Sequence, residues 1–137
     1  MQMDITDTDE ELLAAAKSGN LDAVKHCLQS GATKQNVALN ISADQGHLPV
    51  VQHLLSDGRS QEEIDEALWY AAAVNHLPVV QYLVSEGANY RAKDNRAVVV
   101  AAEEDNLEVT QFFAQLGADI DIVESYGGPE VLKWIQR

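Results

Sequence analysis

One segment of the sequence recurs four times without gaps, and this repetition limits the possible folds more than any other feature. The copies are Leu12–Ala32, Leu39–Arg59, Leu68–Ala88 and Val98–Ala118. Their closing glycines, at positions 31, 58, 87 and 117, are 27, 29 and 30 residues apart. Such periods are typical of arrays in which each unit buries its apolar face only against its neighbours. The chain is therefore predicted to fold as a stack of similar units.

Each copy is predicted to form two short helices joined by a tight turn. Apolar residues of the second helix recur at intervals of three and four, as at Leu77, Val80 and Val84, which marks one helix face. The first helix is rich in alanine, so neighbouring helices can approach closely. Gly and Asn tolerate the left-handed backbone that ends a helix, which places the turns at Gly19-Asn20, Gly46-His47, Asn75-His76 and Asp105-Asn106. The fold class is all-α, a solenoid of helix-turn-helix units.

The second halves of the copies resemble the ankyrin repeat. GNLDAVKHCLQSGA, GHLPVVQHLLSDG, NHLPVVQYLVSEGAN and NLEVTQFFAQLGAD are similar to the family pattern G-H-L-E-V-V-x-x-L-L-x-x-G-A-D, and the resemblance covers roughly Asp9–Arg137. The Thr-Pro-Leu-His start of the family is absent, and the periods are shorter than its usual length of about 33 residues. Short units of this kind look like those of giant viruses and some bacteria. We expect stubby loops where the family has β-hairpins.

The predicted organisation is a single ankyrin-repeat domain over residues 1–137. It has about five units, at 8–32, 37–59, 61–88, 96–118 and 119–137, the last being a C-terminal cap. Two sites have the Ser/Thr-x-x-Glu spacing of a capping box and are expected to start helices, namely Thr8 with Glu11 and Ser60 with Glu63. In the cap, Asp119–Tyr126 is predicted as a shortened first helix and Gly128–Ile135 as the second.

Charge narrows the choice of partner. Nine basic and 22 acidic residues give a formal net charge of −13, which disfavours nucleic acid and anionic membranes and favours a basic protein. The alternative is that the acidity serves only solubility. Residues 1–10 lack the basic and apolar runs of an export signal, and no stretch approaches a membrane span, so a cytoplasmic protein is expected. We also expect the protein to be a monomer when it is unbound.

No pattern in the sequence indicates catalysis, a cofactor or a metal. The single cysteine, Cys27, is expected to be a buried small hydrophobe. His47 and His76 occupy equivalent turns and raise the possibility of zinc, but the resemblance assigns them to packing between units. The carboxylates of 103–105 are expected to form a solvated acidic face, since catalytic use would require a cleft that shifts their pKa values. We therefore expect no enzyme activity.

The resemblance implies binding of a partner protein through the loops and the exposed side of the first helices. Trp69 is the expected anchor, unless a short loop covers it, and Tyr90 is second. The other candidates are Lys17, Asn40, Asp44, Gln45, Val74, Arg91, Arg96, Glu103 and Glu104. The predicted function is protein–protein interaction. Two narrower alternatives are an acidic inhibitor or immunity protein against a basic enzyme or toxin, and a host-directed effector or scaffold.

Overall fold

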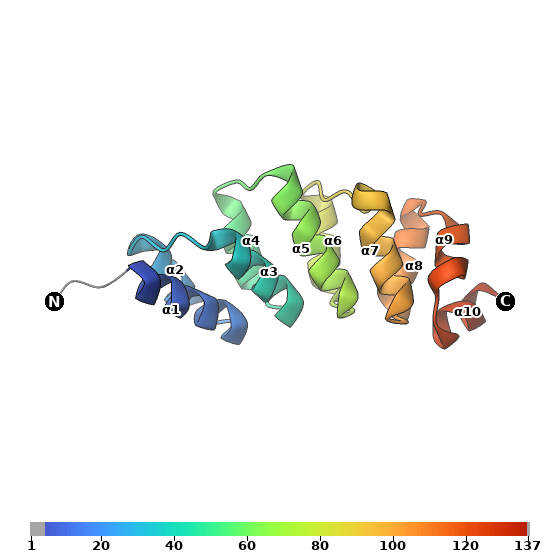
Figure 1. Ribbon diagram of the computed structural model, residues 1–137, viewed down its shortest axis with the longest axis horizontal. Coiled ribbons are helices and arrows are strands. Elements are labelled where there is room, and N and C mark those ends of the chain that lie inside the picture. The colour runs from blue at the N-terminus through green and yellow to red at the C-terminus, as the bar shows by residue number, and fades with distance from the viewer. Residues whose placement is uncertain (1–4, 137) are drawn as a thin grey trace.

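The computed structural model describes residues 5–136, which form ten helices and no strand (Figure 1). The helices are α1 (Ile5–Ser18), α2 (Leu21–Gln29), α3 (Gln35–Gln45), α4 (Leu48–Ser56), α5 (Gln61–Ala73), α6 (Leu77–Ser85), α7 (Ala92–Glu103), α8 (Leu107–Leu116), α9 (Ile120–Tyr126) and α10 (Pro129–Ile135). Residues 1–4 of the polar N-terminal segment, and Arg137, lie outside the described residues. Within the described range, no helix is long and apolar enough to cross a bilayer.

The helices form two layers along the stack. Each odd-numbered helix packs on the even-numbered helix that follows it and on the next odd-numbered helix, while the even-numbered helices contact one another in the second layer. Small residues allow the odd-numbered helices to pack closely on their neighbours, because Ala15-Ala16, Ala71-Ala72 and Ala101-Ala102 are all buried. Leu12, Leu39, Leu68 and Val98, which begin the four copies, are fully buried as well. The predicted solenoid, with short connections in place of β-hairpins, is confirmed.

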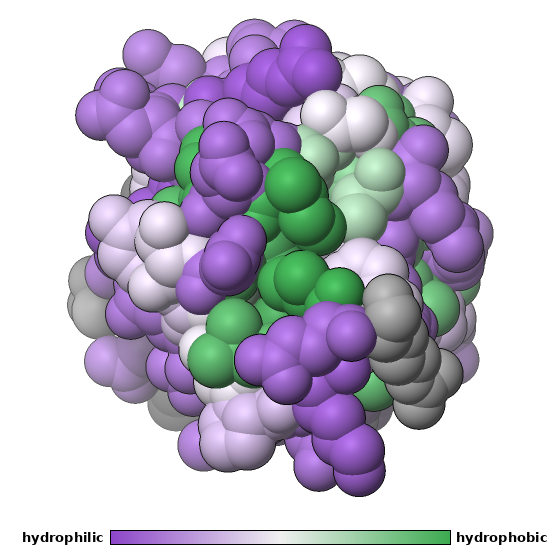
Figure 2. Space-filling model, turned by 90° about the vertical axis from the view of Figure 1, so that its right-hand side faces the viewer, coloured by the Kyte–Doolittle hydropathy of each residue, from purple (hydrophilic) through white to green (hydrophobic). Residues whose placement is uncertain are grey.

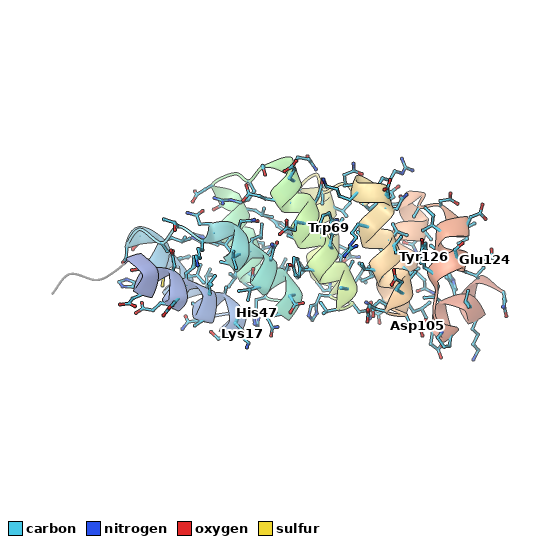
Figure 3. The ribbon with its side chains drawn as sticks, viewed as in Figure 1. Lys17, His47, Trp69, Asp105, Glu124 and Tyr126 are labelled. Carbon is cyan, nitrogen blue, oxygen red and sulfur yellow. The ribbon has the colours of Figure 1, made fainter. Side chains whose placement is uncertain are left out.

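The turns within units have the predicted left-handed backbone. Gly46 has a φ of 78°, and Asn75 and Asp105 have φ values of 60° and 57° at the equivalent places. His47 follows Gly46 in the turn of the second unit, and its ring lies against Gly19 in the turn of the first unit. The Nε2 atom of His47 is 2.9 Å from the Lys17 carbonyl oxygen, which also belongs to the first unit (Figure 3). His47 therefore joins successive units, which is the packing role that the resemblance implied.

Aspartates of the first-layer helices hold the loops between units. The Asp9 carboxylate accepts hydrogen bonds from the Thr33 amide at 2.6 Å and the Thr33 hydroxyl at 3.0 Å. In the same way, Asp65 Oδ1 accepts from the Asn89 amide at 2.7 Å. The hydrogen bond from the Thr33 amide is the main reason that the pKa of Asp9 is lowered from its ordinary value of 3.8. These contacts fix the start of the second and of the fourth unit.

Two predicted helix starts have different outcomes. The capping box at Ser60 is present, since the Ser60 hydroxyl accepts from the Glu63 amide at 3.2 Å and the Glu63 carboxylate accepts from the Ser60 amide. The prediction at Thr8 is wrong, because α1 already begins at Ile5 and Thr8 is a buried residue inside it. The cap helices at 119–126 and 128–135 are confirmed as α9 and α10.

Candidate functional site

Exposed or partly exposed side chains at four-residue intervals form rows along three neighbouring helices. These rows are Val37, Ile41 and Gln45 on α3, then Glu66 and Tyr70 on α5 with Val74 just after it, and finally Arg96 and Val100 on α7 with Glu104 just after it. Residues four apart lie on the same side of a helix. Because α3 packs on α5 and α5 on α7, the rows lie side by side and form one surface, which we call the inner-helix face.

Two grooves cross the inner-helix face. The first groove, between α3 and α5, has a volume of about 540 Å³ and is lined by Lys17, Asn36, Val37, Asn40, Ile41, Asp44, Gln45, Glu66 and Tyr70. The second groove, between α5 and α7, has a volume of about 420 Å³ and is lined by Glu66, Trp69, Tyr70, Ala73, Arg96 and Val100. Glu66 and Tyr70 line both grooves, so Tyr70, which is 43% exposed, forms the ridge between them.

Tyr70 is the central residue that sequence reasoning missed. The equivalent positions of the other copies hold the apolar residues Ala14, Ile41 and Val100, so the repeat pattern does not single out this position. An aromatic residue in that column was the signal that could have identified it. Trp69, the expected anchor, is partly buried against the core (Figure 3) and, of the two grooves, lines the second, with the Arg96 guanidinium carbon 5.9 Å from its ring centre.

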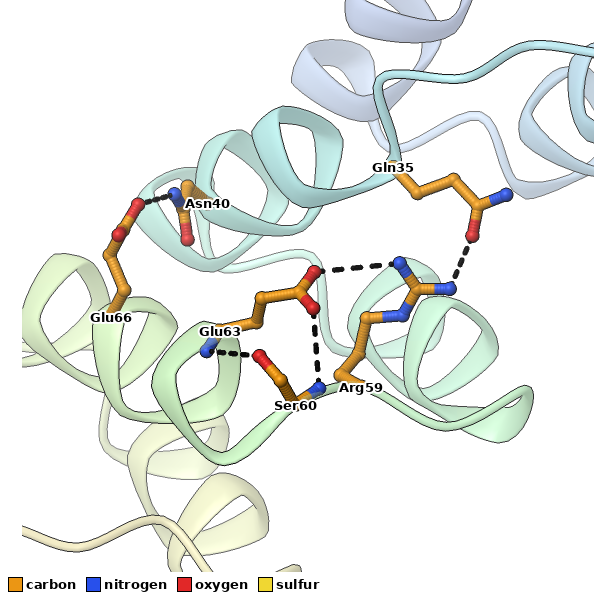
Figure 4. Close-up of polar contacts among 6 residues, drawn as sticks. All are labelled: Gln35, Asn40, Arg59, Ser60, Glu63 and Glu66. Carbon is orange, nitrogen blue, oxygen red and sulfur yellow. Dashed lines mark hydrogen bonds and ion pairs between the residues drawn. The ribbon is translucent and has the colours of Figure 1, made fainter.

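Polar contacts join the helices on either side of the first groove (Figure 4). Asn40 is only 8% exposed, and its amide nitrogen donates to the Glu66 carboxylate. Arg59 donates to the Gln35 side-chain oxygen and pairs with Glu63 at 3.6 Å. The expected site residue Asn40 therefore belongs to the floor of the groove and is nearly covered.

Tyr90 and Arg91 do not join the other predicted residues. The Tyr90 ring stacks on Phe113, with ring centres 5.7 Å apart, and its hydroxyl donates to the Leu116 carbonyl at 3.1 Å. Arg91 lies over the Tyr90 ring and donates to the Gly117 carbonyl at 3.4 Å. Both residues thus pack against the end of α8, and they line neither groove.

The remaining candidates form the edges of the inner-helix face. Lys17, Asp44 and Gln45 line the first groove, while Val74, Glu103 and Glu104 are exposed where α5 and α7 end. Asp105 is an exception in the acidic cluster, because its carboxylate accepts hydrogen bonds from the Glu130 and Val131 amides at 3.0 and 2.9 Å. It therefore holds α10, and only Glu103 and Glu104 are free to face a partner.

The C-terminal end of the stack exposes apolar side chains among polar ones (Figure 2). Ile120 and Tyr126 of α9 are 44% and 49% exposed, and Leu116 of α8 is 41% exposed. No grouping of three or more His, Cys, Asp or Glu in residues 5–136 is placed to hold a metal ion. Cys27 is buried, as predicted, and its burial raises the pKa of the thiol, which lowers the fraction of the nucleophilic thiolate.

A family model of ankyrin repeats, in three copies, matches residues 39–124, which is more than half of the chain. None of the curated protein sequences matches this chain. The matched range begins in α3 and ends in α9, so it contains all the residues that line the second groove and those of the first groove except Lys17, Asn36 and Val37. Helices α1 and α2 precede the match, yet α1 packs on α3 as α3 packs on α5, which makes them a further unit of the same stack.

Proposed function

The chain belongs to the ankyrin-repeat family, whose members are generally protein–protein interaction modules, and we propose that it binds a partner protein through the inner-helix face. Ankyrin-repeat proteins are typically non-enzymatic, and the two grooves suit binding because they are open and shared by three helices. The observation that carries the proposal is Tyr70, a large aromatic residue left 43% exposed between two grooves. Aromatic residues at the centre of an interface commonly supply much of the binding energy.

The surroundings of Tyr70 support the same role. Val37 and Val74 are also large apolar residues with 44% and 38% exposure, the first lining the first groove and the second following α5 four residues after Tyr70. Trp69 adds aromatic area in the second groove, and Arg96 covers part of its ring. The charged residues Lys17, Asp44, Glu103 and Glu104 form a polar rim. An apolar centre with a polar rim is the usual anatomy of a protein interface.

A narrower version is an acidic inhibitor that neutralises a basic enzyme or toxin. The net charge of −13 favours this version, because opposite charge speeds association and suppresses binding of acidic competitors. Glu103 and Glu104 would act at the rim, where charges change the association rate more than the affinity. Partners that are all neutral or acidic would eliminate it.

The test is capture of the partner from the native cell, followed by affinity measurements on variants. We expect Tyr70→Ala to weaken binding by about 2 kcal/mol, roughly 30-fold, because a central aromatic anchor is lost. The control is Leu116→Ala, which removes an apolar side chain of similar exposure, 41%, from α8 in the second layer. Circular dichroism should show that both variants stay folded. If Tyr70→Ala binds as tightly as the unmodified protein, the inner-helix face is not the binding surface.

A further inference from the structure

We propose that the first groove binds an arginine side chain of the partner, with the guanidinium held by the Glu66 carboxylate and the amide oxygen of Asn40. This inference rests on the proposed function and specifies the chemistry of its partner. Asn36, Asn40 and Glu66 are three of the polar side chains that line this groove between α3 and α5, the others being Lys17, Asp44, Gln45 and Tyr70. Their state of hydrogen bonding is what points to a cation.

The groove has more hydrogen-bond acceptors than donors. The Asn40 amide nitrogen donates a hydrogen bond to Glu66, while the side-chain oxygen of Asn40 is buried and has no hydrogen-bond partner. The Asn36 side-chain oxygen is in the same state. A buried acceptor without a donor costs free energy, and terminal amides rotate easily, so an arriving donor can recover that cost. A ligand that only donates is the chemical match to this set.

The lack of a partner for Asn36 follows from the repeat. Asn36 occupies the position of Asp9 and Asp65, whose carboxylates each accept the backbone amide 24 residues further along the chain. The corresponding amide for Asn36 is that of Ser60, which instead donates to Glu63 within the capping box. The third unit therefore breaks the pattern, and the oxygen of Asn36, a residue that lines the groove, is left without a donor.

Arginine fits this site better than lysine does. Its planar guanidinium carries five donors, pairs with a carboxylate through two hydrogen bonds, and can stack on an aromatic ring such as that of Tyr70 beside Glu66. The aliphatic stem would lie along Val37 and Ile41. Arg59, the nearest arginine in the sequence, is held by Gln35 and Glu63, so the chain does not supply this group from there.

The test uses the full ¹⁵N-labelled chain and three peptides, acetyl-Ala-Arg-Ala-amide and its lysine and citrulline counterparts. Citrulline is the uncharged analogue of arginine. We expect saturable NMR shifts for α3 and α5 amides lining the first groove, with an arginine-peptide dissociation constant on the order of 1 mM. The other two peptides should bind at least about fivefold more weakly, since neither offers a charged, planar donor.

Two variants separate this site from general attraction to an acidic protein. Glu66→Gln should weaken binding of the arginine peptide by about tenfold, since a charged hydrogen bond becomes a neutral one. Glu62→Gln, on the same helix but outside the first groove, should leave it unchanged. Equal binding of the three peptides, no binding up to about 20 mM, or shifts that Glu66→Gln does not reduce would each overturn the inference. Those outcomes would not affect a partner protein whose binding depends on Tyr70. The arginine site and the proposed function are therefore tested independently.

Discussion

At the turn of the second unit, Gly46 meets two separate requirements. Its φ of 78° lies in the left-handed region, where a side chain is strained. A Cβ atom would also lie 2.8 Å from the ring of His76, which packs there from the next unit. Gly58 has a similar φ of 88° but no atom within 4 Å of the place that a Cβ would occupy. The two glycines therefore allow backbone strain to be separated from contact between units.

We predict that Gly58→Ala lowers the free energy of unfolding by about 1 kcal/mol, the cost of a left-handed alanine. Gly46→Ala should cost about 1–3 kcal/mol more, because the methyl group displaces the imidazole ring. Urea unfolding followed by circular dichroism measures both values. Combining Gly46→Ala with His76→Ala should recover much of the difference. Equal losses for the two glycines would show that the ring does not pack as the structure indicates.

The Asp9 carboxylate makes stability depend on pH in a predictable direction. Its pKa is lowered in the folded state, chiefly by the Thr33 amide, so the ionised form is favoured by folding. The resulting stabilisation is present above the ordinary value of 3.8 and is lost as pH falls through the folded pKa. Asp9→Asn should therefore be less stable than the unmodified protein at pH 7, and the difference should shrink below about pH 4. Urea unfolding across this range tests it, and a difference that is constant with pH would contradict it.

At the scale of the helices, α10 depends on a residue from a neighbouring unit. It begins after Gly128, which has no side chain to cap the helix, and Asp105 accepts the amides of Glu130 and Val131 in its place (Figure 3). We predict that Asp105→Ala costs about 1–2 kcal/mol, the usual loss for a helix cap. Hydrogen exchange should show the loss first in α9 and α10. Glu104→Ala, at an exposed neighbouring position, is the control and should change little.

The helices could be predicted from the repeat, whereas the places where the chain departs from the repeat could not. Ala71-Ala72 and the apolar positions of α6 could be assigned from spacing, because the same pattern recurs in every copy. The start of α7 could not, since Lys93, Asp94 and Asn95 all have left-handed φ values of 53–62° without a glycine among them. Thr8 matched a capping-box spacing, yet the helix continues past it. Local spacing alone does not show whether such a site is used.

The sequence predicted which surface of the stack is exposed, but it predicted less well which residues line that surface. Lys17, Asp44 and Gln45 do line the first groove, since the repeat determines which side of each first helix is exposed. The contact of Tyr90 with Phe113 could not be predicted, because it depends on how a loop folds against α8, which spacing does not determine, and the binding role of Tyr90 stays a prediction. The binding roles of Trp69 and Tyr70 both remain predictions, and Tyr70→Ala tests that of Tyr70.

At the scale of the whole molecule, like charges are the dominant electrostatic feature. The chain has 22 acidic and 9 basic residues, and the described residues form one ion pair, between Arg59 and Glu63. Carboxylates thus have few cations to offset them. Repulsion of this kind destabilises a compact state, and dissolved salt screens it.

We therefore predict that salt acts in opposite directions on the free protein and on its complex with a basic partner. Raising KCl from about 10 to 150 mM shortens the screening length from about 30 to 8 Å. The free protein should gain stability on the order of 1 kcal/mol, because repulsion is screened and little attraction is lost. The same change should slow association with the partner. Urea unfolding and stopped-flow binding measure the two effects. If salt destabilised the free protein, attractive pairs would outweigh repulsion, and if association were indifferent to salt, the acidity would have no part in binding.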